Sequence, residues 1–187
     1  MLRLAVLVSG RGTNLQALLD HQSSDYEVSL VCSNRAGAPA LERARRAGVP
    51  AFVFEGRPAQ VEMARAIREA RADLIVLAGF DRLLSAEFFA TLDNAAPLVS
   101  THPSLLPKYG GPGMIGRRVH EAVLAAGDLE TGCTVFRTRP DRIDEGEILA
   151  QTRVPVVAGD TPETLEARVL EAEHETLVRT VRRLSHE

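Results

Sequence analysis

The chain has 187 residues, of which 45% are hydrophobic and 25% are charged. A chain of this size and composition forms a substantial core, and we expect a single globular domain over residues 1–187. The formal net charge of -3 gives no electrostatic reason to expect nucleic-acid binding. The two cysteines, Cys32 and Cys133, lie in apolar runs and are too few for a disulfide framework. We therefore expect buried thiols in a reducing compartment.

The first residues, MLRLAVLVSGRG, contain an apolar stretch. The stretch is too short to span a membrane, and it ends in glycines rather than in the small residues of a signal-peptide cleavage site. We interpret it as a buried strand and expect a cytoplasmic protein with no membrane partner.

In the first half of the chain, short runs of Val, Leu and Ile alternate with amphipathic stretches. The apolar runs predict strands at Leu2–Val8, Val28–Cys32, Ala51–Phe54 and Leu74–Ala78. The amphipathic stretches predict helices at Asn14–His21, Pro39–Ala47 and Ala59–Ala70. Strand–helix alternation implies right-handed crossovers. The expected fold class is therefore α/β, with a doubly wound, mostly parallel twisted sheet and flanking helices.

The second half, from residue 101, has a different pattern. Too many Pro and Gly residues occupy His102–Gly116 for regular structure. Strands are predicted at Pro97–Ser100, Thr134–Thr138 and Ile148–Val157, with a helix at Arg117–Ala126 and a polar loop at Asp141–Gly146. The last two strands predict an antiparallel edge. The final helix should open with Thr161 as N-cap, Pro162 in the first turn and Thr164 in place of the capping-box Glu.

A glycine-rich loop, Ser9-Gly10-Arg11-Gly12-Thr13-Asn14, lies between the first strand and the first helix. Its glycines permit a backbone that turns several amides toward one anion at the positive end of the helix. A dinucleotide site lacks its third glycine, because that position is Leu15, and no Gly-Lys-Ser/Thr is present for a triphosphate. The loop therefore predicts a monophosphate site. The alternative is that the tight turn between strand and helix requires glycine and binds no ligand.

His102 opens the run His102-Pro-Ser-Leu-Leu-Pro107 directly after a predicted strand. Open α/β sheets bind ligands at the carboxyl ends of their strands. A rigid loop that holds an imidazole there can stabilise developing charge or move a proton; a histidine that only caps the strand or packs is the alternative. Asp144 would orient that imidazole, or it simply forms a turn ahead of Gly146.

Metal chemistry is not indicated by the histidines. They show no metal-ligand spacing and no cysteine pair accompanies them; they are His21, His102, His120, His174 and His186. We therefore expect no metal.

Together these motifs resemble the phosphoribosylglycinamide formyltransferases, members of the folate-dependent formyltransferase superfamily. The resemblance extends from the start of the chain to about residue 180. It rests on six runs: Ser9-Gly-Arg-Gly-Thr-Asn14, Leu77-Ala-Gly-Phe80, His102-Pro-Ser-Leu-Leu-Pro107, Gly132-Cys-Thr-Val135, Asp144-Glu-Gly146 and Glu171-Ala-Glu-His174. It implies a Rossmann-like formyltransferase fold, with residues 1–100 as the mononucleotide-binding half and 101–187 as the half with the catalytic loop and the folate site.

The resemblance also implies an activity and its partners. The activity would be transfer of the formyl group of 10-formyltetrahydrofolate, a co-substrate, to the amine of glycinamide ribonucleotide in purine synthesis, by a monomer or a homodimer. Residues matching the ribonucleotide site are Gly12, Thr13, Asn14, Gly79, Pro103 and Glu173. Residues matching the folate site are Arg57, Arg82, Leu83, Leu84 and Ile143. His102 and Asp144 match two members of the family's catalytic trio.

The third member of that trio is an asparagine two residues before the histidine, and here Ser100 takes its place. A hydroxyl is shorter than an amide by about one bond, and losing an oxyanion donor costs roughly 10²–10³ in turnover. Ser100 therefore keeps two alternatives open: a formyltetrahydrofolate hydrolase, and a folate- or nucleotide-binding homologue with impaired catalysis. Smaller departures from the family pattern are Asp81, Phe136 and Leu170.

Overall fold

The computed structural model describes residues 1–138 and 143–187. Part of the loop expected at Asp141–Gly146, namely residues 141 and 142, lies outside the described residues. The chain divides into two compact units: residues 1–99 together with 181–187 form the first, and residues 100–180 form the second. The single-domain assignment stays a prediction.

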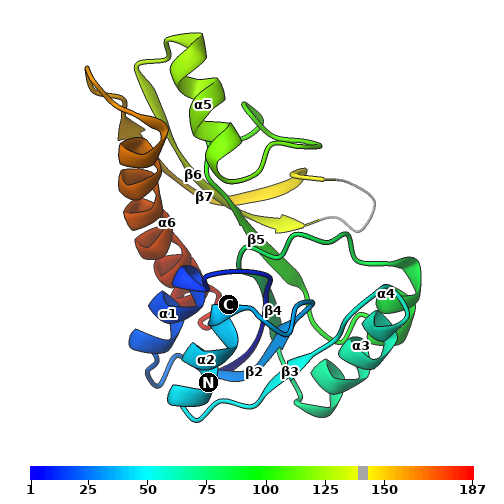
Figure 1. Ribbon diagram of the computed structural model, residues 1–187. Helices are drawn as coiled ribbons and strands as arrows, with labels where there is room; N and C mark the ends of the chain where they lie inside the picture. Colours follow the sequence, from blue (N-terminus) through cyan, green and yellow to red (C-terminus); the bar gives the residue numbers. More distant parts are fainter. Residues whose placement is uncertain (139–142) are drawn as a thin grey trace. The chain divides into compact units, whose positions relative to one another are not determined.

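The first unit is built from alternating strands and helices (Figure 1). Its strands are β1 (Leu2–Val8), β2 (Tyr26–Ser33), β3 (Ala51–Val53) and β4 (Leu74–Leu77), and β5 (Leu98–His102) starts in it. Its helices are α1 (Thr13–Asp20), α2 (Pro39–Arg46), α3 (Ala59–Glu69) and α4 (Ala86–Leu92). The strand order is β3-β2-β1-β4-β5. The three pairings of β1 with β2, β1 with β4 and β2 with β3 are all parallel, as expected.

Burial on both faces explains why β1 has no polar–apolar alternation. Residues 4–8 are all fully buried. Ala5 and Leu7 belong to a core cluster that also contains Met63 and Ile67 of α3 and Phe88 of α4. Helices therefore cover the sheet, which is the condition under which a parallel sheet forms.

The second unit carries the antiparallel edge. β5 enters it at Ser100, followed by α5 (Arg117–Ala126), β6 (Glu130–Thr138), β7 (Gly146–Pro155) and most of α6 (Pro162–Leu184). The strand order is β5-β6-β7, and β6 pairs with β7 in antiparallel register. Val123, Cys133 and Val169 belong to the core of this unit. The predicted fold class, a mostly parallel sheet with an antiparallel edge, is confirmed.

The predicted start of α6 is confirmed in detail. The Thr164 amide donates to Thr161 Oγ1 (3.3 Å), and the Thr161 amide donates to Thr164 Oγ1 (2.9 Å). Thr164 thus completes a reciprocal cap in the role usually taken by Glu. None of the described helices is both long and apolar enough to cross a membrane.

Some predicted bounds are shifted: β6 starts at Glu130 instead of Thr134, and β7 covers Gly146–Pro155 instead of Ile148–Val157. Two further features differ from the sequence predictions. Helix α4 was not predicted. Ser85 caps it by accepting a hydrogen bond from the Phe88 amide (3.2 Å), and its two buried side chains are Phe88 and Leu92 at i and i+4. His102 was expected in the loop after a strand ending at Ser100, but it is the last residue of β5. The strand continues because Ser100 and Thr101 are compatible with an extended backbone.

Gly132 generates a prediction about the β6–β7 pair. A Cβ at this position would lie 2.0 Å from the Thr152 carbonyl oxygen and 2.8 Å from Leu105 Cδ2. Gly132→Ala should therefore lower the free energy of unfolding by at least about 1–3 kcal/mol, since backbone must move. Gly37→Ala is the matched control, because nothing lies within 4 Å of its added Cβ. Urea unfolding measures both, and equal stabilities for the two variants would contradict the β6–β7 register.

Candidate functional site

His102 is the central residue of the second unit's candidate site. It ends β5, and only 4% of its surface is exposed. Its Nε2 lies 2.7 Å from the Tyr109 carbonyl oxygen, and its Nδ1 lies 3.5 Å from Asp144 Oδ1. A carbonyl only accepts, so Nε2 carries a proton and donates to Tyr109. The other nitrogen, Nδ1, faces the Asp144 carboxylate, which fixes the orientation of the ring.

Both partners of the imidazole have unusual backbone conformations. Asp144 has φ 53° and Tyr109 has φ 55°, in the left-handed region. That region is uncommon for Asp and a genuine outlier for a bulky aromatic residue. The Gly111 amide also donates to Asp144 Oδ2 (2.9 Å) and holds the carboxylate. Backbone strain concentrated around one side chain is typical of functional sites.

Strand alternation separates Ser100 from Thr101. Ser100 lies two residues before His102 on β5, so the two side chains share one face of the strand. The Ser100 hydroxyl is 3.5 Å from the Thr101 carbonyl, at the limit of a hydrogen bond. Thr101 Oγ1 instead donates to Oε1 of Glu173 (2.8 Å), a buried carboxylate on α6. Thr101 therefore orients Glu173, the residue expected to hold the ribonucleotide.

The glycine-rich loop occupies the carboxyl end of β1 in the first unit. Gly12 is the N-cap of α1 with φ 72°. A Cβ there would lie 2.5 Å from that of Ala40 on α2, so the position requires glycine both for its conformation and for its contact. Thr13 and Asn14 begin α1. The structure therefore places the three predicted phosphate ligands in one turn.

Asp81 closes a ring of hydrogen bonds that joins the ends of three strands. Ser9 Oγ donates to Asn34 Oδ1 (2.7 Å), Asn34 Nδ2 donates to Asp81 Oδ1 (3.0 Å), and the Asp81 amide donates to Ser9 Oγ (2.9 Å). Arg35 forms an ion pair with the same carboxylate. This departure from the family pattern therefore fixes the neighbourhood of the glycine-rich loop, a role that sequence analysis missed.

The residues expected to hold folate are divided between the units. In the first unit, Gln60 accepts from the Ser85 amide (2.7 Å) and donates to the Leu83 carbonyl (3.0 Å), which fixes the stretch after β4. The Leu83 side chain is 72% exposed. The remaining positions are exposed or half-buried: Arg57, Gly79, Arg82 and Leu84 in the first unit, and Pro103 and Ile143 in the second.

His120 of α5 is a second buried imidazole, and sequence analysis assigned it no role. It is 1% exposed, and its Nδ1 has no hydrogen-bond partner among the residues that the structure describes. Burial lowers its pKa below 6.5; Glu166 opposes this shift and His102 adds to it. The sequence signal that could have indicated its burial is its position on the predicted helix, one residue after Val119, which is also buried.

The chain is similar to known proteins over nearly its full length. The family model described as formyl transferase matches residues 2–181. Phosphoribosylglycinamide formyltransferase of Escherichia coli is 40% identical over 182 residues, which cover 92% of this chain and 82% of the relative. The trifunctional purine biosynthetic protein adenosine-3 of Drosophila melanogaster is 43% identical over 183 residues, and this chain spans 13% of its length.

Solved structures agree with these relatives. The crystal structure of phosphoribosylglycinamide formyltransferase from Anaplasma phagocytophilum superposes with a TM-score of 0.89 at 36% identity. The match covers 99% of this chain and 87% of that one. The fold of this chain is therefore that of the solved phosphoribosylglycinamide formyltransferase.

His120 generates a prediction for the pH dependence of stability. Its folded-state pKa lies below its ordinary value of 6.5, so the unfolded chain binds more protons as the pH falls below that value. The free energy of unfolding should then fall by up to about 1.4 kcal/mol per pH unit for this group between pH 6.5 and the folded-state pKa.

Urea unfolding at pH 7.5, 6.5 and 5.5 measures this dependence. His120→Gln should flatten it in part, while the remainder comes from His174, whose pKa burial also lowers. An unchanged pH dependence in His120→Gln would show that folding does not lower the pKa of His120.

Proposed function

The chain belongs to the formyl transferase family, and we propose that it transfers the formyl group of 10-formyltetrahydrofolate to the amine of glycinamide ribonucleotide. The products would be formylglycinamide ribonucleotide and tetrahydrofolate, in cytoplasmic purine synthesis. The family match and the relatives named for this reaction support the reaction class. The contact between His102 and Asp144 is the observation that carries the assignment of the chemistry.

The proposed reaction needs positioning and charge stabilisation. The amine nitrogen attacks the formyl carbon, and the carbonyl electron pair moves to oxygen. The tetrahedral oxyanion then collapses, the bond from carbon to the folate nitrogen breaks, and the proton lost by the amine goes to that leaving nitrogen. His102 would donate to the oxyanion through the Nε2–H group that donates to the Tyr109 carbonyl in this structure, so the Tyr109 carbonyl would release that group when the substrates bind. Asp144, facing Nδ1, would hold the imidazole in the orientation that permits this donation. Bringing two bound substrates together supplies much of the remaining acceleration.

Binding roles are assigned to the matched residues. Gly12, Thr13 and Asn14 would bind the phosphate through a turn whose carbonyls point away from it. Glu173, oriented by Thr101, would accept from hydroxyls of the ribose. Further ribonucleotide contacts would come from Gly79 and Pro103.

The pterin and its tail would bind to a second group of residues. The backbone of the stretch fixed by Gln60, Arg82–Leu84, offers peptide groups to the pterin. Ile143 would provide an apolar contact, and Arg57, whose side chain is 76% exposed, would attract the carboxylates of the glutamate tail.

Whether the proposed enzyme is fully active or impaired depends on Ser100. Its side chain shares the strand face of His102, which supports the proposal that its hydroxyl is the second oxyanion donor, directly or through water. Its shorter reach makes this donation weaker than that of an amide.

A deformylation assay tests the reaction. The protein is incubated with 10-formyltetrahydrofolate, with and without glycinamide ribonucleotide, and loss of the formyl group is followed by absorbance. We expect deformylation that depends on the amine. Deformylation without the amine would instead identify a hydrolase, and binding of both substrates without turnover would identify an inert homologue.

Ser100 generates a second kinetic prediction. Ser100→Asn should raise kcat by roughly ten-fold or more, because an oxyanion donor supplies about 10²–10³ in turnover, and it should change KM little. The matched variant Ser100→Ala removes the hydroxyl and should lower kcat. A fall in kcat for Ser100→Asn would mean that the serine belongs to a different working arrangement.

A further inference from the structure

Three consecutive carbonyls of the glycine-rich loop, those of Gly10, Arg11 and Gly12, each accept a hydrogen bond. Gly10 O accepts from the Ala40 amide (3.2 Å), and Gly12 O accepts from the Gln16 amide (2.9 Å). The carbonyl between them, Arg11 O, accepts from Nε of Arg43, a residue of α2, at 2.8 Å. Two of these three bonds come from α2, which is distant from the loop in sequence.

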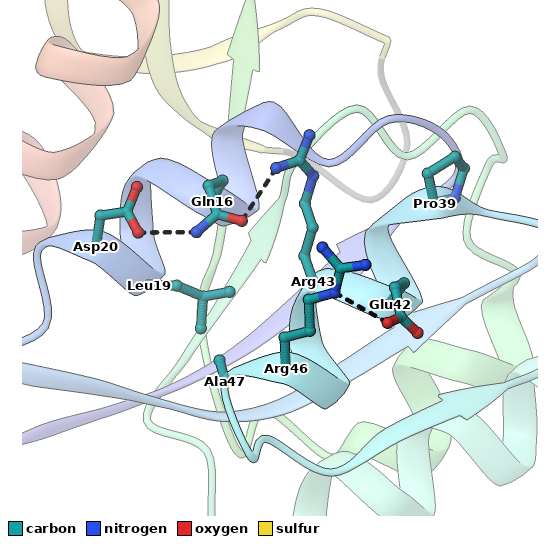
Figure 2. A pocket seen from close by; sticks show the side chains of 8 residues that line it. All are labelled: Gln16, Leu19, Asp20, Pro39, Glu42, Arg43, Arg46 and Ala47. Carbon is teal, nitrogen blue, oxygen red and sulfur yellow. Dashed lines mark hydrogen bonds and ion pairs between the residues drawn. The ribbon is translucent and has the colours of Figure 1, made fainter.

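Arg43 is held in place by its own partners. Its Nη1 donates to Gln16 Oε1 (3.0 Å), and Gln16 Nε2 donates to Asp20 Oδ1 (2.8 Å). Figure 2 shows this chain of contacts across a groove of about 660 Å³ that α1 and α2 line. The guanidinium is thus anchored at two points, one on α1 and one on the loop.

Because a peptide group is planar, the hydrogen bond to Arg11 O also fixes the direction of the Gly12 N–H. Arg11 C=O and Gly12 N–H belong to one trans peptide, so they point in opposite directions. Fixing the oxygen toward Arg43 aims the Gly12 amide to the other side of the loop. Gly12 is the first of the three proposed phosphate ligands.

We propose that Arg43 is a positioning residue that sets the phosphate-binding conformation of the loop through the Arg11–Gly12 peptide. This inference rests on the proposed function, because the phosphate is that of the ribonucleotide. Its guanidinium acts through the loop and does not contact the substrate. Hydrogen bonds to charged groups are strong, so loss of this bond should release the loop. Because the loop would hold the phosphate and not the reacting atoms, the loss should weaken binding of the ribonucleotide and leave kcat unchanged.

The expected effect is selective for one substrate. In Arg43→Met, the KM for glycinamide ribonucleotide should rise by about ten-fold, the effect of losing one charge-assisted hydrogen bond. The KM for 10-formyltetrahydrofolate and kcat should stay within about two-fold. Arg43→Lys keeps the charge but cannot bridge Arg11 O and Gln16 Oε1, so it should restore binding only in part.

Arg46→Met is the matched control. Arg46 is on the same helix, its side chain is 79% exposed, and it pairs with Glu42 of its own helix. This variant removes the same charge without touching the loop, so its KM for the ribonucleotide should equal that of the wild type. Thermal unfolding of each variant, without ligand, shows whether the fold is retained.

A second readout does not depend on turnover. Inorganic phosphate should raise the unfolding temperature of the wild type and of Arg46→Met, and raise it less in Arg43→Met. Equal phosphate stabilisation in all three proteins, or complete rescue by Arg43→Lys, would overturn the positioning role. A wild-type protein that binds phosphate but shows no amine-dependent turnover would contradict the proposed function alone, and the phosphate shifts would still decide the role of Arg43.

Discussion

A buried imidazole has to satisfy two ring nitrogens, and His102 does so with the Tyr109 carbonyl and the Asp144 carboxylate. Both partners come from irregular segments rather than from the sheet, and both occupy left-handed backbone conformations. The strain at these positions is retained because the Gly111 amide and the packed end of β5 hold the arrangement. The proposed chemistry depends on this contact more than on any other in the second unit.

The first unit fixes the backbone of the turn that we propose to bind the phosphate, in which Gly12 and Asn14 are buried. It does so by occupying the carbonyls: α2 supplies two of the donors, and Gly12 permits the close approach of Ala40. The ring of Ser9, Asn34 and Asp81 ties the same region to the ends of β2 and β4. In both units, side-chain hydrogen bonds therefore fix the backbone at the carboxyl ends of strands, where α/β sheets bind ligands.

Local patterns were sufficient for most elements of the fold. β1 and α5 have the predicted bounds. In β1, an apolar run interrupted only by Arg3 ends before Ser9, and in α5 a glycine C-cap at Gly127 closes the helix. Helix α4 was missed because seven residues with two buried side chains give little periodicity. The extension of β5 to His102 was missed because Pro103 suggested an earlier break.

The candidate site was predictable only where a motif carried it. The glycine-rich loop and His102 stand out as runs of sequence, and Asp144 was expected opposite His102. The roles of Arg43, Asp81 and His120 could not be predicted, because each depends on contacts with residues far away in the chain. An arginine on an amphipathic helix has no sequence feature that distinguishes it from the solvent-exposed Arg46 beside it.

The fate of the formyl carbon tests the central claim most directly. With 10-formyltetrahydrofolate labelled by ¹³C in the formyl group, mass spectrometry should find the label as a formamide on the ribonucleotide, and His102→Asn should abolish its appearance there. Label recovered as formate with the ribonucleotide unchanged, or undiminished transfer by His102→Asn, would contradict the assignment of the reaction to this imidazole.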